Sequence, residues 1–184
     1  MALTESKNLS IGTIAPNFEL LNTRDNKTVN LSEVKGLKGT AIFFICNHCP
    51  FVVHVNEELI KLANDYYKKG ISFIAISSND ANKYPQDGPE KMKTHAEKVG
   101  YPFPYLFDET QEVAKAYDAA CTPDLYLFDD ELKLVYHGQL DDSRPGNEKP
   151  LTGKDFRNAI NNLLDQKFPI ENQKPSIGCN IKWK

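Results

Sequence analysis

The sequence predicts an α/β fold, with a central mixed sheet flanked by helices and an N-terminal β-hairpin extension. Three consecutive segments carry this prediction. Residues 40–45 contain a run of apolar side chains, which is typical of a strand buried on both faces. Residues 52–66 repeat apolar side chains at helical spacing, and residues 71–76 are a second apolar, β-branched run. Strand, helix and strand of these lengths form a right-handed parallel crossover unit.

Length and composition favour one globular domain. The chain has 184 residues, of which 40% are hydrophobic, so it can bury a sizeable core without disulfide staples. We expect a single domain over residues 1–184, with a less regular arm at 1–12 and a less regular tail at 168–184. A net charge of -3 indicates no electrostatic capture of nucleic acid or of an anionic membrane. The sequence shows no bilayer-spanning stretch and no secretory signal, so we expect a cytoplasmic protein.

The segments around the crossover unit continue the pattern. In front of it, residues 18–21 and 28–31 flank a polar, turn-rich stretch and form a small hairpin. Behind it, a longer excursion over residues 79–108 contains a further helix.

The second half of the chain completes the topology. A short helix is predicted over residues 110–117, and residues 125–128 and 132–136 form an antiparallel hairpin around an acidic turn. A last helix starts at Thr152 and has a regular apolar face. The resulting order is strand, helix, strand, helix, hairpin and helix behind an N-terminal hairpin, which is the thioredoxin topology with additions.

Cys46 and Cys49 lie where the first buried strand gives way to the helix. Thiols at positions i and i+3 can close a short disulfide ring, and the start of a helix stabilises a thiolate. We expect Cys46 to be the attacking thiolate, which forms a mixed disulfide, and Cys49 to resolve it. His48 lies between them and, when protonated, adds positive charge that tunes thiol acidity and reduction potential. Pro50 suits the first turn of the helix.

The segment Cys121-Thr122-Pro123 precedes the second hairpin. A Thr-Pro bond here is consistent with a cis peptide that places backbone beside the reactive sulfur. The sequence alone leaves the isomer open, since trans is the general default for X-Pro bonds.

These motifs resemble those of a peroxiredoxin-like member of the AhpC/TSA group within the thioredoxin superfamily. The matching segments extend over nearly the whole chain: Ala15-Pro16-Asn17-Phe18, Phe44-Ile45-Cys46-Asn47-His48-Cys49-Pro50, Cys121-Thr122-Pro123-Asp124 and Ser176-Ile177-Gly178-Cys179. The resemblance implies a thioredoxin fold, redox-active Cys46 and Cys49, and a cis bond before Pro123.

The chain departs from this group at two points. True peroxiredoxins place their peroxidatic cysteine in a Pro-x-x-x-Thr-x-x-Cys pattern. Those two positions hold Gly39 and Phe43 when counted from Cys46, and Ile42 and Cys46 when counted from Cys49. The peroxide-orienting hydroxyl is therefore missing. Thioredoxins also carry a buried Asp on the preceding strand, but residues 40–45 contain no acid, so the proton of Cys49 is left to another group or to water.

The main alternative for the cysteine pair is a zinc site. Cys46 and Cys49 could bind zinc with a third ligand such as His48, His54 or Cys121. Structural zinc normally takes four ligands, and the sequence has no second close cysteine pair, so redox chemistry is favoured and no metal site is assigned.

Two further cysteines leave alternatives open. Cys121 is a possible additional redox thiol that exchanges with Cys46, or else a buried free thiol that packs as a small hydrophobe. Cys179 could be a resolving thiol, a glutathionylated thiol or a packed side chain.

The sequence therefore predicts a thiol–disulfide oxidoreductase that uses the Cys46/Cys49 couple, with Thr122 and Pro123 as backbone on the substrate side. We expect it to reduce protein or small-molecule disulfides without a bound cofactor, and to be reduced by a redox protein or a low-molecular-weight thiol. Neither nucleic acid nor membrane is an expected partner. The alternatives are a thiol-dependent peroxidase with an antioxidant role, in which Cys46 forms a sulfenic acid, and a metal-binding or redox-sensing module.

Overall fold

The computed structural model describes residues 3–167, 170 and 172–184. Within them, a seven-stranded mixed sheet has the order β3-β2-β6-β5-β4-β8-β9. Its strands, in chain order, are β2 (Glu19–Asn22), β3 (Lys27–Asn30), β4 (Gly39–Phe44), β5 (Ile71–Ser77), β6 (Tyr105–Phe107), β8 (Asp124–Asp129) and β9 (Leu134–His137). A second, three-stranded sheet has the order β1-β10-β7 and consists of β1 (Leu3–Glu5), β7 (Cys121–Thr122) and β10 (Ile177–Asn180).

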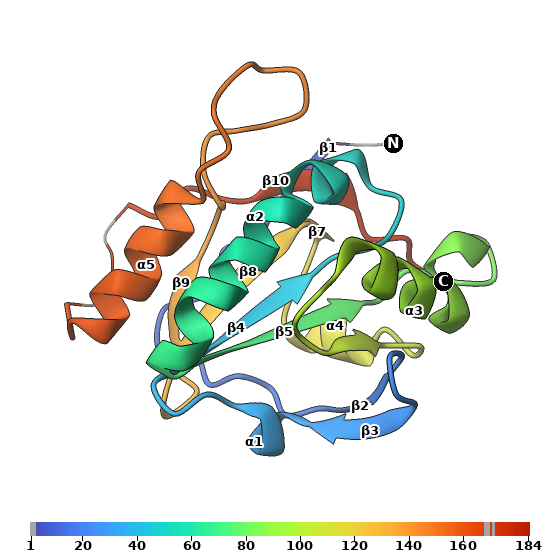
Figure 1. Ribbon diagram of the computed structural model, residues 1–184, viewed down its shortest axis with the longest axis horizontal. Helices are drawn as coiled ribbons and strands as arrows, with labels where there is room; N and C mark the ends of the chain where they lie inside the picture. Colours follow the sequence, from blue (N-terminus) through green and yellow to red (C-terminus); the bar gives the residue numbers. More distant parts are fainter. Residues whose placement is uncertain (1–2, 168–169, 171) are drawn as a thin grey trace.

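Helices cover both faces of the seven-stranded sheet (Figure 1). The helices are α1 (Leu31–Val34), α2 (Pro50–Tyr66), α3 (Pro89–Val99), α4 (Glu112–Ala116) and α5 (Lys154–Leu164), with short 3-10 turns at Tyr67–Lys69 and Pro85–Asp87. Alternate residues of β4 face opposite cores because successive strand side chains point to opposite faces. Phe43 packs in the core that holds residues of α2, α3 and α5, whereas Phe44 packs in the core that holds residues of α1 and α4.

The crossover unit predicted from the sequence forms the centre of the molecule. Strands β4 and β5 are parallel, with Phe44 opposite Ile76, and α2 connects them. Strand β8 pairs antiparallel with the other edge of β4, so that Asp124 lies opposite Phe44. The end of β4 and the start of β8 are therefore adjacent, and this places the segment after Phe44 beside the segment before Asp124.

Four strands were not predicted. Strand β6 lies at the end of the excursion, β7 lies directly before Pro123, β1 lies within the arm, and β10 lies within the tail. Each has only two to four residues, which is too short for an alternating pattern to stand out from the neighbouring loop. The arm and the tail are tied to each other because β1 pairs antiparallel with β10.

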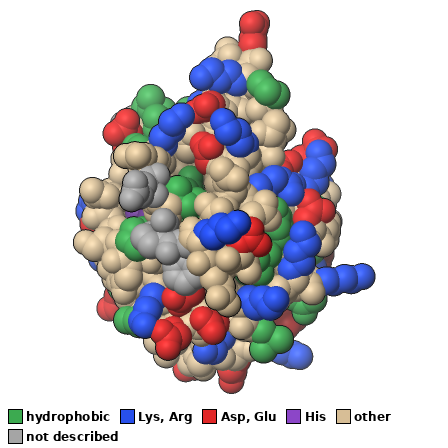
Figure 2. Space-filling model, turned by 90° about the vertical axis from the view of Figure 1, so that its left-hand side faces the viewer, with side chains coloured by type: hydrophobic (Ala, Val, Ile, Leu, Met, Phe, Trp, Pro, Cys, Tyr) green, Lys and Arg blue, Asp and Glu red, His purple; other side chains and the backbone are tan. Residues whose placement is uncertain are grey.

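The surface carries charges of both signs. On the side seen in Figure 2, Lys and Arg side chains are interspersed with Asp and Glu side chains, without a broad area of one sign. In the described part of the chain, no helix combines the length and the apolar character needed to cross a membrane.

Candidate active site

The two cysteines of the redox turn are both buried, between the end of β4 and the first residue of α2. Cys49 is the N-cap residue of α2, and Pro50 occupies the first helical turn as predicted. The structure therefore places Cys49, rather than Cys46, directly at the helix start. Cys49 is consequently the sulfur that lies closest to the positive end of the helix dipole.

A cis peptide joins Thr122 to Pro123, as the resemblance implied. The Thr122 hydroxyl lies 3.5 Å from the Sγ of Cys46. The Cys49 Sγ lies 3.1 Å from the Thr122 carbonyl oxygen. One residue of this loop thus contacts both sulfurs, with its side chain on one and its backbone on the other.

Cys179 is the cysteine outside the redox turn that the structure brings onto the pair. Its Sγ lies 2.7 Å from the Sγ of Cys49. Strand β10 positions it, since Cys179 pairs with Thr122 of β7. Cys121 is buried in the same small sheet, and its thiol is directed to the Pro123 carbonyl oxygen at 3.6 Å. An exchange role for Cys121 stays a prediction.

The pair of thiols shares its protons unequally. A hydrogen bond from Cys46 lowers the pKa of Cys49 to about 5, against the opposing effect of burial, and hydrogen bonds with Cys179, Thr122 and the backbone of Val52 add to this effect. The same contact with Cys49, together with burial and the negative charge of Asp87, raises the pKa of Cys46. These effects favour the thiolate on Cys49 over a thiolate on Cys46 in the reduced protein. This differs from the expectation that Cys46 carries the charge, because the helix start and the hydrogen-bond donors act on Cys49.

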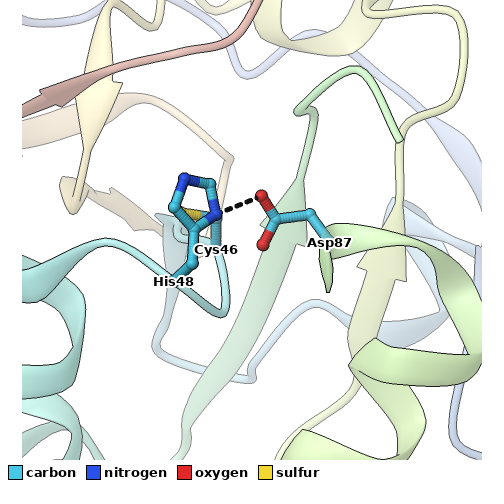
Figure 3. A group of neighbouring side chains, drawn as sticks. All are labelled: Cys46, His48 and Asp87. Carbon is cyan, nitrogen blue, oxygen red and sulfur yellow. Dashed lines mark ion pairs between the residues drawn. The ribbon is translucent and has the colours of Figure 1, made fainter. Parts of the chain in front are cut away.

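A buried carboxylate faces His48. Asp87 lies in the 3-10 turn before α3, and its Oδ2 is 2.6 Å from Nδ1 of His48 (Figure 3). Its two oxygens also accept hydrogen bonds from the Asn47 backbone N–H at 2.9 Å and from the Asn79 side chain at 2.8 Å. The His48 ring stacks parallel to Tyr84, with a centroid distance of 5.6 Å. The imidazole is therefore held in one orientation beside Cys46.

Sequence reasoning missed Asp87. Residues 40–45 contain no acidic side chain, and Asp87 provides one near the redox turn. It comes from a turn 40 positions after Asn47, and it lies near Cys46 rather than Cys49. No spacing rule connects a redox turn to such a distant residue. The one available signal was the length of the excursion that contains it.

A second buried acid anchors the cis-proline loop. Asp124 directly follows Pro123, and its Oδ1 lies 2.8 Å from Nε2 of His137. Its Oδ2 accepts hydrogen bonds from the Tyr126 hydroxyl at 3.2 Å and from the Ala120 backbone N–H at 3.3 Å. These contacts fix the residue that follows the cis-proline.

The donor atoms of Cys46, His48 and Asp87 all lie within 4.8 Å of one another. Thiolate, imidazole and carboxylate are the three ligand types that zinc takes in proteins. The set differs from the predicted alternative, since it contains Asp87 in place of Cys49. His54, another predicted zinc ligand, instead lies 2.8 Å from the Ser143 hydroxyl.

The chain is similar to known proteins in both sequence and structure. The model of the AhpC/TSA family matches residues 11–137. The crystal structure of an uncharacterized conserved protein from Geobacillus kaustophilus is 61% identical, covers 100% of this chain and 97% of its own, and has a TM-score of 0.98. The thiol-disulfide oxidoreductase ResA of Geobacillus kaustophilus (strain HTA426) is 28% identical over 142 residues, which are 74% of this chain and 75% of ResA.

A more distant structure bears on the fold alone. The thioredoxin domain of a thiol-disulfide oxidoreductase from Bacteroides vulgatus is 20% identical, covers 85% of this chain and 99% of its own, and has a TM-score of 0.67. The predicted thioredoxin-like α/β fold is confirmed by this similarity.

Proposed function

Because the chain belongs to the AhpC/TSA family, we propose that it is a thiol–disulfide oxidoreductase in which Cys46 is the nucleophile and Cys49 the resolving thiol. The observation that carries the proposal is the hydrogen-bonded thiol pair, buried at a strand-to-helix junction against a cis Thr122–Pro123 bond. The similarity to ResA, a thiol-disulfide oxidoreductase, supports the same class of reaction.

The first step uses Cys49 as the proton acceptor. The Cys46 sulfur attacks one sulfur of the substrate disulfide while its proton passes to the Cys49 thiolate, which already shares that proton. A bond forms between Cys46 and the attacked sulfur, the substrate disulfide bond breaks, and the other substrate sulfur leaves as a thiolate. The protein thereby forms a mixed disulfide.

The second step closes the ring. Cys49 loses its proton to water and attacks the Cys46 sulfur, so that the Cys46–Cys49 disulfide forms and the second substrate thiol is released. The protein dithiol has then lost two electrons, and the substrate disulfide has gained them. A redox protein or a low-molecular-weight thiol returns the electrons.

The remaining predicted site residues orient and tune this exchange. His48, fixed by Asp87 and Tyr84, lies beside Cys46 and, when protonated, offsets negative charge that develops on the reacting sulfur. The Thr122 hydroxyl and the adjoining cis bond lie next to the attack site, where they offer hydrogen-bonding groups to the substrate backbone.

The test is turnover of a protein disulfide. With insulin as substrate and dithiothreitol as reductant, wild-type protein should accelerate disulfide reduction, and Cys46→Ser should reduce the rate to that of dithiothreitol alone. A matched control is Cys121→Ala, which also removes one buried thiol but leaves the contacts between Cys46 and Cys49 in place. Full turnover by Cys46→Ser would overturn the assignment.

Peroxide reduction is a second candidate, and one contact favours it. The Thr122 hydroxyl lies 3.5 Å from the Cys46 sulfur. It could take the place of the threonine hydroxyl that orients peroxide in true peroxiredoxins and that this sequence lacks. Against it, the contact with Cys49, burial and the Asp87 carboxylate raise the pKa of Cys46, whereas the thiolate is the species that peroxide oxidises. Reduced protein mixed with one equivalent of hydrogen peroxide should lose its thiols slowly. Rapid second-order loss would favour the peroxidase.

Metal binding is a third candidate because of the clustered Cys46, His48 and Asp87 donors. Elemental analysis of protein purified without chelator decides it. We expect less than one equivalent of zinc, with no change in insulin reduction after treatment with a chelator. One tightly held equivalent of zinc that Asp87→Asn removes would instead assign a metal-binding module.

A further inference from the structure

The sulfur of Cys179 lies beside Cys49, on strand β10 near the end of the chain. We propose that Cys179 is the third thiol of the redox centre, and that the oxidised protein passes its disulfide from Cys46–Cys49 to Cys49–Cys179. The inference deepens the proposed function and rests on it, since it assigns the fate of the disulfide that substrate reduction leaves in the protein.

The central position of Cys49 is the first argument. The sulfurs of Cys49 and Cys179 are 2.7 Å apart, and a disulfide bond is about 2.0 Å long, so a small approach joins them. Cys49 also exchanges a hydrogen bond with Cys46. Cys49 is therefore in contact with both of its possible disulfide partners.

The packing of β10 is the second argument. Cys179 pairs with Leu3 of β1 on one side and with Thr122 of β7 on the other, so its backbone is fixed from both edges. The preceding residue is Gly178, where an added Cβ would lie 2.0 Å from the Thr122 carbonyl oxygen. Only glycine lets β10 approach the cis-proline loop this closely, and the approach is what brings Cys179 to Cys49.

The exchange balances without any other reactant. The Cys179 sulfur attacks the Cys49 sulfur of the Cys46–Cys49 disulfide. The Cys49–Cys179 bond forms, the Cys46–Cys49 bond breaks, and the proton of Cys179 passes through solvent to Cys46. The number of disulfides is unchanged: Cys46 returns to a thiol, Cys179 enters the disulfide, and Cys49 stays oxidised throughout.

The exchange returns Cys46 to the thiol form. The Cys46 thiol then lies beside His48, and the disulfide joins Cys49 to Cys179; all three cysteines are buried. The Cys121 thiol is directed to the Pro123 carbonyl, and its own exchange with Cys46 stays a separate prediction.

Disulfide mapping after oxidation tests the proposal. Fully reduced protein is mixed with one equivalent of oxidised glutathione, quenched with acid at successive times, alkylated and digested without reductant. Wild-type protein should show the Cys46–Cys49 disulfide first and the Cys49–Cys179 disulfide afterwards. Cys46→Ser should form Cys49–Cys179 as its intramolecular disulfide, and the Cys121→Ala control should match the wild type.

The outcomes separate this proposal from the proposed function. If Cys46–Cys49 forms in the wild type and Cys49–Cys179 appears in neither protein, the transfer is wrong and the oxidoreductase assignment stands. If wild-type protein forms no intramolecular disulfide while its thiols stay reduced, both are wrong. The wild-type time course decides the matter even if Cys46→Ser fails to fold.

Discussion

At the scale of single residues, the proposed exchange depends on which of the two sulfurs holds the proton. Cys46 and Cys49 form a coupled pair, whose ionisations belong to the pair and not to one sulfur. Donors gather around Cys49, whereas a carboxylate lies near Cys46, so the first negative charge of the pair is favoured on the resolving thiol. Cys46 becomes nucleophilic as its proton moves to Cys49, and this makes Cys49 the base that the preceding strand does not supply.

Replacing Asp87 should shift this balance. In Asp87→Asn the negative charge that raises the pKa of Cys46 is lost, while the amide oxygen can still accept from Asn47. We expect the second ionisation of the pair to move to lower pH. Thiolate absorbance at 240 nm, followed against pH, measures both ionisations. Asp124→Asn, which alters an equally buried carboxylate that does not act on the pKa of either thiol of the pair, is the control. An unchanged second ionisation in Asp87→Asn would contradict the assignment.

Removing the Cys179 thiol should act on the other ionisation. Its hydrogen bond lowers the pKa of Cys49, which lies at about 5 in the wild type. One lost hydrogen bond is worth about 1 kcal/mol, so Cys179→Ala should raise the pKa of the first ionisation of the pair by about 0.7 unit. The same absorbance titration detects it. Cys121→Ala should leave this ionisation in place, and equal curves for wild type and Cys179→Ala would show that the contact is not made in solution.

At the scale of elements, the site forms where three segments that share no sequence motif come together. The turn between β4 and α2 supplies the pair, the cis-proline loop before β8 contacts both sulfurs, and β10 brings the third thiol. The parallel and antiparallel neighbours of β4 fix the first two segments, because Phe44 pairs with Ile76 and Asp124. The third depends on the small sheet and on one glycine.

That glycine gives a prediction about stability. Gly178→Ala places a methyl group 2.0 Å from the Thr122 carbonyl, so β10 must move away from the loop. Overpacking of this kind costs about 1–3 kcal/mol, and urea unfolding followed by circular dichroism should show a loss in this range. Formation of the Cys49–Cys179 disulfide should slow in the same variant. Gly146→Ala, whose added methyl meets nothing within 4 Å, should leave disulfide formation unchanged.

The elements differed in how well the sequence predicted them. Long periodic segments such as β4 and α2 were predicted because apolar spacing reports burial directly. Strands β1 and β10 were not predicted, because their pairing is long-range and each is too short to show an alternating apolar pattern. The cysteine pair could be found from its local context, whereas the contact of Cys49 with Cys179 follows only from the register of β10 on β7.

At the scale of the whole molecule, the redox pair belongs to the larger core. Cys46 and Cys49 are counted among the side chains that pack between the sheet and α2, α3 and α5. The site forms only when folding brings together residues that are far apart in the sequence. Asp87 and Cys179 are examples, and no local sequence pattern predicts their contacts. The ionisation of the pair should therefore be coupled to folding.

The coupling predicts how stability depends on pH. The folded-state pKa of Cys49, about 5, lies below the value of about 8.5 for a free thiol, so thiolate formation stabilises the folded state above about pH 8.5. This contribution should fall as the pH drops towards 5 and vanish below it. Urea unfolding of the reduced protein between pH 5 and pH 8, compared with Cys49→Ala, should give a stability difference that grows with pH. A constant difference would mean that the pKa of Cys49 is not lowered.

The identity of the attacking sulfur is tested most directly by trapping the mixed disulfide. Cys49→Ser removes the resolving thiol, so reaction with oxidised glutathione at mildly alkaline pH, where the solvent can accept the proton of Cys46, should halt after the first step. Mass mapping should locate one glutathione on Cys46. A protein that gains no glutathione, or gains it on Cys121 or Cys179 while Cys46 stays unmodified, would contradict the account.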